Sequence, residues 1–264
     1  MEFEPLEEDI EYYDSKTDSN IQIVFVPGIG GWKTWKHQLK YFSNRYRTLC
    51  VRTDDRDYES SVKALKTVLN RKNLDNVVLI GSDLSNRVVQ SFSDRKTVIS
   101  TVMTNFSFEI PKVRRETFKL VSSTCGKPKL LKKLFLSENT NYRIARELSE
   151  ELELMDYSDY CSYSGIESDT EIENGLVIQA SDDRFSTLED AIALRPDITV
   201  REVAGGSFCF YEKPEEFNKA LAEFADRLES FIESKQIREK REKNRSLDEF
   251  ETQKTFQEQL EIRE

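Results

Sequence analysis

Residues 77–88 read V-V-L-I-G-S-D-L-S-N-R-V, and this stretch decides the fold. Val77–Ile80 is a β-branched apolar run that predicts a buried strand, and the small residues around Asp83 predict a sharp turn. The residues from Leu84 onward predict a helix. A turn this tight drives its central residue, Asp83, toward positive φ, a conformation that aspartate tolerates better than most side chains.

The alternation of strand and helix continues through most of the chain. Further strands are predicted at Ile21–Val26, Arg47–Val51, Val98–Met103, Leu176–Ala180 and Ile198–Val203. Further helices are predicted at Trp32–Phe42, Tyr58–Leu69, Leu84–Phe92, around Leu188–Leu194 and from Pro214 onward. This order predicts an α/β fold, with a mostly parallel sheet and helices on both of its faces.

Two segments interrupt or extend this pattern. Residues 107–174 are polar, rich in Lys, Arg and Glu, and lack a convincing buried strand. We therefore expect a helical cap inserted over the carboxyl edge of a core formed by residues 1–106 and 175–234. Residues 235–264 are mostly charged and predict a solvated, partly helical C-terminal extension, with a partner-binding amphipathic helix as the alternative.

Composition excludes several classes of function. The 264 residues carry a net charge of −10, which argues against non-specific binding to nucleic acid or to anionic lipid. No apolar run approaches the roughly 20 residues that a membrane span requires, and we expect a cytoplasmic protein. The four cysteines have no metal-ligand spacing, so neither a metal nor another cofactor is expected.

Four segments, taken in order, resemble the α/β-hydrolase superfamily in its cap-bearing form, which is related to esterases, haloalkane dehalogenases and epoxide hydrolases. They are I-Q-I-V-F-V-P-G-I-G-G-W-K-T-W at 21–35, the turn at 77–89, L-V-I-Q-A-S-D-D-R-F at 176–185, and V-A-G-G-S-F-C-F-Y-E-K-P-E-E-F-N-K-A-L-A-E-F at 203–224. The resemblance covers residues 8–234 and implies the α/β-hydrolase fold. The last segment is also weakly similar to maspardin, whose family has a Gly-Gly-polar-Phe stretch in place of the usual Gly-His.

The resemblance implies a degenerate catalytic triad. Asp83 matches the nucleophile, Asp183 the acid and Ser207 the histidine, and the N–H groups of Ile29 and Leu84 match the oxyanion hole. An aspartate nucleophile attacks alkyl carbons or epoxides and leaves an ester that a base-activated water must hydrolyse. The serine hydroxyl at position 207 cannot take that proton near neutral pH.

His37 and Cys209 are the other two side chains whose chemistry is suited to catalysis. His37 is the single histidine of the chain, and it follows the Gly28–Gly31 loop on a predicted helix. We expect a partly exposed helical residue there, with a displaced catalytic base as the alternative. Cys209 is expected to be a packing residue because no nearby base would generate its thiolate. The Gly28–Gly31 loop fits neither the dinucleotide fingerprint nor the Walker pattern.

Two functions of different classes follow from these residues. The first is an α/β-hydrolase homologue that has lost catalysis, a pseudoenzyme that acts as a binding or scaffold protein for an unknown small molecule or protein. The alternative is an active hydrolase of the dehalogenase, epoxide-hydrolase or esterase kind that uses Asp83 as its nucleophile. The nature of any basic group within hydrogen-bond reach of Asp83 distinguishes them. The oligomeric state cannot be predicted from these features.

Overall fold

The computed structural model describes residues 1–108, 110, 112–123, 127–166, 175–194 and 198–261. Cys125 and the last three residues of the predicted extension lie outside this set, as do the side chains after residue 238. Contacts between residues divide the chain into two units, Met1–Ala222 and Glu223–Glu264, which are described separately.

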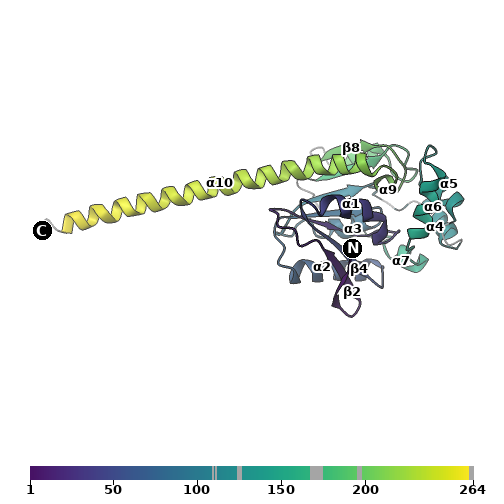
Figure 1. Cartoon of the computed structure of the whole chain (residues 1–264), viewed down its shortest axis with the longest axis horizontal. Helices are drawn as coiled ribbons and strands as arrows, with labels where there is room; N and C mark the ends of the chain where they lie inside the picture. Colours follow the sequence, from purple (N-terminus) through teal and green to yellow (C-terminus); the bar gives the residue numbers. More distant parts are fainter. Residues whose placement is uncertain (109, 111, 124–126, 167–174, 195–197, 262–264) are drawn as a thin grey trace. The chain divides into compact units, whose positions relative to one another are not determined.

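The first unit is built on an eight-stranded sheet with the order β1-β2-β4-β3-β5-β6-β7-β8 (Figure 1). Neighbouring strands from β4 to β8 are parallel, whereas β1 and β2 pair antiparallel at one edge. The strands are β1 (Glu4–Glu7), β2 (Ile10–Asp14), β3 (Gln22–Phe25), β4 (Arg47–Thr53), β5 (Val77–Ser82), β6 (Val98–Thr104), β7 (Leu176–Ala180) and β8 (Thr199–Val203). The predicted fold class, α/β with a mostly parallel sheet, is therefore confirmed.

Strands β3 and β5 lie in the middle of the sheet, and they read as near-continuous apolar runs because helices cover both of their faces. Every residue of β5 is buried. The hairpin of β1 and β2 was not predicted from the sequence. Its strands are short and rich in acidic residues, and in β2 only Ile10 and Tyr12 are buried, the alternation expected where one face of an antiparallel pair is turned to solvent.

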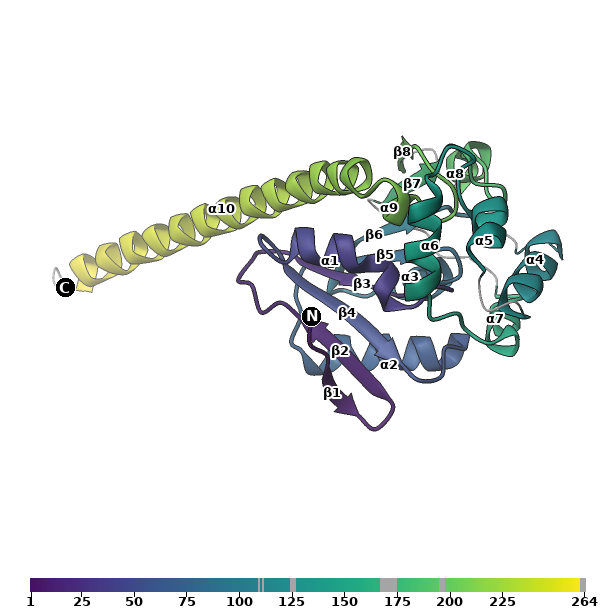
Figure 2. The same ribbon diagram turned by 45° about the vertical axis from the view of Figure 1, so that its right-hand side comes forward.

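The helices α1 (Lys36–Phe42) and α2 (Tyr58–Arg71) lie on opposite faces of the sheet (Figure 2). The predicted helix at 32–42 divides into a 3-10 turn, η1 (Trp32–Trp35), followed by α1. Trp35 is fully buried and stacks on Phe210, with 4.1 Å between the ring centroids. At the start of α2 the carboxylate of Asp57 accepts hydrogen bonds from two main-chain N–H groups, which caps the helix.

The helices α4 (Lys112–Ser123), α5 (Pro128–Phe135), α6 (Tyr142–Glu151) and α7 (Tyr157–Ser162) follow β6 in the chain. Both views place them at the carboxyl ends of the parallel strands (Figures 1 and 2). The described part of residues 107–174 contains these helices and no strand. We use the word cap only as a short name for the described residues of this region, 107–108, 110, 112–123 and 127–166.

Polar contacts attach the cap closely to the sheet domain. The N–H of Ser207 donates to the carbonyl oxygen of Phe135 over 2.7 Å, and Lys36 pairs with Glu151 over 2.6 Å. Gly206 passes so near that a Cβ there would lie 2.5 Å from the same Phe135 oxygen. The cap therefore packs on the loop that contains Ser207.

Four helices remain among the described residues: α3 (Ser85–Gln90) after β5, α8 (Leu188–Leu194) after β7, then α9 (Cys209–Glu212) and α10 (Pro214–Glu261) after β8. Met103, Val177 and Ala191 form one core cluster that joins α8 to strands β6 and β7. The helix α10 begins in the first unit and continues as one helix through the second. The extension is thus helical throughout its described residues, more than the partly helical segment that the sequence predicted.

Among the described residues, none of the helices combines the length and the apolar character that crossing a membrane demands.

Candidate functional site

The turn after β5 has the geometry that the sequence predicted. Asp83 has a φ of +58°, in the left-handed region, and its N–H donates to the carbonyl oxygen of Thr104 at the end of β6. Ser85 accommodates the turn with its hydroxyl, which accepts a hydrogen bond from the Ser82 N–H and lies 2.9 Å from the carbonyl oxygens of Val26 and Ser82. A Cβ at Gly81 would lie 2.9 Å from the Ser85 carbonyl oxygen, so the turn needs glycine there. The turn thus holds Asp83 at the carboxyl edge of the sheet.

The basic group beside Asp83 is an arginine from the cap. The Arg114 Nη2 atom, from α4, lies 2.6 Å from Asp83 Oδ1, and the two side chains are only 3% and 6% exposed. The pair is a close charge contact whose angles fall outside those of an aligned hydrogen bond. The guanidinium also lies 5.1 Å from the Phe185 ring centroid. Asp83 is therefore covered and neutralised by a residue that the sequence analysis did not single out.

Burial and neighbouring charges act in opposite directions on Asp83. Burial raises the pKa of Asp83, the guanidiniums of Arg114 and Arg87 oppose that rise, and the charge of Asp183 adds to it. Arg87 comes from α3, and its Nη2 donates to the carbonyl oxygen of Phe108 over 3.0 Å. Two arginines and two aspartates therefore lie around one largely dry site, where unpaired charge is costly.

Asp183 and Ser207 are in direct contact. The Ser207 hydroxyl donates to Asp183 Oδ1 over 2.5 Å, and the Ser186 hydroxyl donates to Oδ2 of the same carboxylate. Asp183 is also near enough to Asp83 for its charge to raise the pKa of Asp83. The three residues matched to the triad, which follow strands β5, β7 and β8, therefore lie at one edge of the sheet. Both carboxylate oxygens of Asp183 are thus occupied by serine hydroxyls.

Asn105, directly after β6, holds the loop of Ser207 in place. It has a φ of +54°, its side-chain amide donates to the carbonyl oxygen of Ser207 over 3.1 Å, and its Oδ1 accepts from the N–H of Ala180. One side chain thereby ties together the ends of β6 and β7 and the segment 206–207. Asn105 was not among the residues predicted from the sequence. Its only signal there is an asparagine between an apolar strand and the polar segment that begins at residue 107.

The residues matched to the oxyanion hole are buried on both sides of the turn. Leu84 follows Asp83 directly and is 1% exposed, and Ile29 in the loop after β3 is 4% exposed. The carbonyl oxygen of Ile29 accepts from the N–H of Met155, and that of Gly30 accepts from the N–H of Glu153. The cap segment 153–155 therefore runs along the loop of Ile29 and is hydrogen-bonded to it.

His37 lies on α1 and is partly exposed, as predicted. Its ring meets the Tyr211 ring edge-on with 5.2 Å between centroids, and burial lowers its pKa. The largest charge effects on the pKa of His37 come from Lys36 and Lys40, which lower it, and from Glu151 and Glu147, which raise it. Cys209 is a fully buried free thiol, as expected of a packing residue, and Cys50 is buried to the same extent. Among the described residues no cluster of three or more His, Cys, Asp or Glu is arranged to hold a metal ion.

Arg114 had a sequence signal that was overlooked. In α4 the buried residues are Arg114, Phe118 and Val121, which are spaced by four and three and so share one face of the helix. An arginine on the apolar face of an amphipathic helix needs a buried acceptor or anion, because its charge is otherwise too costly.

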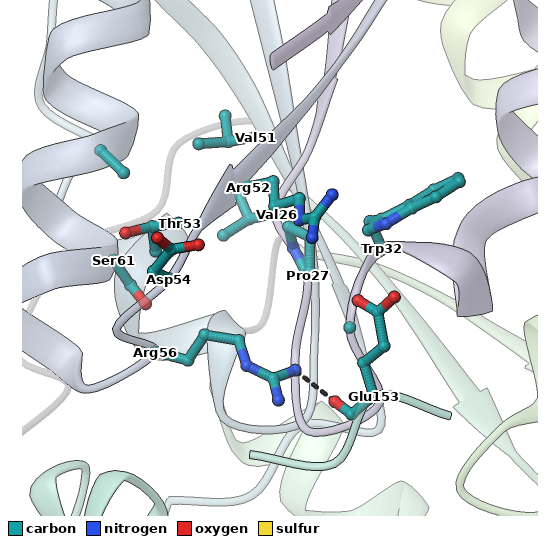
Figure 3. A pocket seen from close by; sticks show the side chains of 12 residues that line it. Val26, Pro27, Trp32, Val51, Arg52, Thr53, Asp54, Arg56, Ser61 and Glu153 are labelled. Carbon is teal, nitrogen blue, oxygen red and sulfur yellow. Dashed lines mark hydrogen bonds between the residues drawn. The ribbon is translucent and has the colours of Figure 1, made fainter. Parts of the chain in front are cut away.

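The structure also contains a cavity that is displaced from these residues. It has a volume of about 210 Å³ and lies at the ends of β3 and β4, where Glu153 of the cap closes one side (Figure 3). Asp83, Asp183 and Ser207 are not among the residues that line it. This cavity and the triad-matched residues are therefore separate features of this edge of the sheet.

No protein-family model and no curated protein matches the sequence. Solved structures do match the fold. A thermophilic esterase from Thermogutta terrifontis, solved with malate bound, is 13% identical with a TM-score of 0.63, over 83% of this chain and 94% of that one. An enol-lactonase from Burkholderia xenovorans LB400 is 13% identical with a TM-score of 0.65, over 82% and 97% of the two chains. A bromoperoxidase from Bacillus anthracis is 14% identical with a TM-score of 0.62, over 82% and 95%. The protein has the α/β-hydrolase fold.

Proposed function

We propose that the protein is a non-catalytic member of this fold, which binds a ligand or partner and does not turn over a substrate. The observation that carries the proposal is the ion pair of Asp83 with Arg114, at 2.6 Å and almost wholly buried. In this proposal Asp83, Asp183 and Ser207 correspond to the triad positions and Ile29 and Leu84 to the oxyanion-hole positions.

The pair supports loss of catalysis because of what each group can donate or accept. A carboxylate nucleophile needs an open approach for an electrophilic carbon, and the guanidinium of Arg114 occupies that approach at Asp83. Arginine keeps its proton at every physiological pH and has no acceptor atom, so Arg114 cannot serve as the base that activates water. Arg114, the side chain in contact with Asp83, therefore cannot supply the base that hydrolysis requires.

The second support comes from position 207. The Ser207 hydroxyl donates a hydrogen bond to one oxygen of Asp183, and the Ser186 hydroxyl donates a hydrogen bond to the other oxygen of that carboxylate. In a working triad the acid orients a histidine that takes and returns a proton. Here the acid orients two hydroxyls, which remain protonated near neutral pH.

Hydrolysis assays test this proposal. Wild type, D83A and D94A are offered activated short-chain esters, alkyl halides and epoxides, and product is followed over time. Asp94 is exposed, so D94A is a matched control for loss of one carboxylate. We expect all three proteins to give the same rate as buffer. Turnover by wild type and D94A that is absent from D83A would contradict the proposal.

One observation favours the second candidate, an active hydrolase with Asp83 as nucleophile. The turn is intact, with Asp83 at a φ of +58°. Such an enzyme would require Arg114 to leave the site and another base to enter it. The D83A comparison above identifies this candidate directly, because its activity would depend on Asp83.

A further inference from the structure

The displaced cavity is bounded by the sheet, by α2 and by the cap segment at Glu153 (Figure 3). Its volume of about 210 Å³ is below the roughly 300–1,000 Å³ of most small-molecule sites, so its ligand is small. Val26, Val51 and the indole of Trp32 supply apolar wall, while Thr53 and Ser61 add hydroxyls. A wall of this composition suits a compact molecule with one apolar body and few polar groups.

Arg56 is the most informative residue in this cavity. Its guanidinium is held by a hydrogen bond from Nη1 to the main-chain carbonyl oxygen of Glu153 (Figure 3). Among the described residues it forms no ion pair with a carboxylate, because the Glu153 side chain pairs instead with Lys33 over 2.8 Å. Arg56 therefore presents a fixed, half-buried positive charge whose remaining N–H donors have no carboxylate partner of their own.

The second arginine and the acidic groups of the cavity are placed differently. Arg52, at the end of β4, is 42% exposed and pairs with Glu11 over 3.1 Å, so it is partly available at the opening. Asp54 is exposed to solvent, where water screens its charge. Glu153 is already neutralised by Lys33. Arg56 is therefore the half-buried charge of this lining that has no ion pair among the described residues, although the carboxylates of Glu153, Asp159 and Asp156 act on it from farther away.

We propose that this cavity binds a small organic acid. Its carboxylate accepts hydrogen bonds from Arg56, with Arg52 at the opening, and its apolar body lies against Val26, Val51 and Trp32. A guanidinium presents paired N–H donors that match a carboxylate in geometry and charge. This inference rests on the proposed function in one respect, since it names the ligand class of a protein that binds and does not catalyse.

The test uses the full chain and defined probes. Benzoate has a flat apolar body and one carboxylate, and benzamide is its uncharged counterpart of the same shape. Phenylacetate and succinate extend the acid series, and inorganic phosphate represents a bare anion. Binding is followed by calorimetry and by quenching of tryptophan fluorescence, and W32F shows how much of the quenching comes from the Trp32 indole in the cavity wall.

We expect at least one of the organic acids to bind at millimolar concentration or better, and benzamide to bind at least tenfold more weakly than benzoate. R56Q should weaken acid binding roughly ten- to hundredfold, since it removes a charged hydrogen-bond donor. The exposed Arg143 supplies the matched control, and R143Q should bind as wild type does. Because Arg56 also contacts the cap, R52Q is measured in parallel as a variant that leaves the bond to Glu153 intact; it should weaken binding several-fold.

Several results would overturn the inference. They are equal binding of benzoate and benzamide, preference for phosphate over every organic acid, unchanged affinity in folded R56Q and R52Q, or no binding by any of the acids. None of these outcomes bears on Asp83. Failure of the inference is therefore distinguishable from failure of the proposed function, which only the hydrolysis assays with D83A decide.

Discussion

Removing Arg114 should expose the energetic cost of the buried carboxylate at Asp83. Both side chains are at most 6% exposed, so water cannot replace the lost partner in R114M. Breaking a buried ion pair from one side typically costs about 3–5 kcal/mol, whereas removing both charges is often close to neutral. We therefore expect R114M to lower the free energy of unfolding by about 3–5 kcal/mol, and D83N/R114M to recover most of this loss. Asparagine is chosen at position 83 because it tolerates the positive φ there.

The assay is equilibrium unfolding in urea at pH 7, with wild type, D83N, R114M and the double variant completing a cycle. R115M is the control, since Arg115 is the next residue on α4 and its hydrogen bond to Ser164 is long, at 3.5 Å. The control should lose less than about 1 kcal/mol, as is usual for surface pairs. Two results would refute a stabilising ion pair. One is an R114M variant as stable as R115M, and the other is a D83N/R114M variant whose loss of stability equals the sum of the losses in D83N and R114M.

The same variant has a defined pH dependence. Burial raises the pKa of Asp83 in the folded state, and Arg114 opposes the rise, so R114M should raise it further. Between the unfolded pKa, about 3.9, and the higher folded value, the folded state holds a proton that the unfolded state has lost. The contribution of Asp83 is therefore most favourable below the unfolded pKa and is lost as pH rises through the folded value. The stability gap between R114M and wild type should widen from pH 4 toward pH 7; a gap that is constant or narrows would contradict this.

Two further predictions follow from packing. G206A should lower the free energy of unfolding by about 1–3 kcal/mol, because its methyl group would lie 2.5 Å from the Phe135 carbonyl oxygen. The measurement is urea unfolding, and a G206A variant as stable as wild type would show that the loop and the cap are not in close contact. In the native protein Cys50 and Cys209 should resist iodoacetamide while the partly exposed Cys161 reacts, since burial raises the pKa of both buried thiols; peptide mass mapping that finds Cys209 alkylated first would contradict this order.

Local patterns were sufficient to predict most of the sheet and its covering helices. The apolar run at Val77–Ile80 and the small residues after it determine a buried strand and a tight turn over a few neighbouring residues, so the positive φ at Asp83 could also be predicted. The hairpin of β1 and β2 could not be predicted, because its short acidic strands obtain their pairing from β4, a distant part of the chain.

The site was only partly predictable for a related reason. Asp83, Asp183 and Ser207 were found because each follows a recognisable strand, which fixes its place at the sheet edge. The partnership of Asp83 with Arg114 depends on how the cap packs on the sheet, and no local pattern specifies that packing. The cavity at Arg56 likewise arises where β4, α2 and the cap meet, and it exists only once all three are in place.

We propose above all that Asp83 is held by Arg114 and does not act as a nucleophile. The most direct measurement is mass spectrometry of the Asp83 peptide after wild type has been incubated with alkyl halides and epoxides in ¹⁸O-labelled water. An aspartate nucleophile would appear either as an alkyl ester on Asp83 or, after hydrolysis at the carboxyl carbon, as ¹⁸O in its carboxylate. We predict an unmodified Asp83 peptide that carries no more ¹⁸O than the same peptide of wild type kept in labelled water without a substrate. An alkyl adduct or ¹⁸O located at Asp83 would contradict the claim.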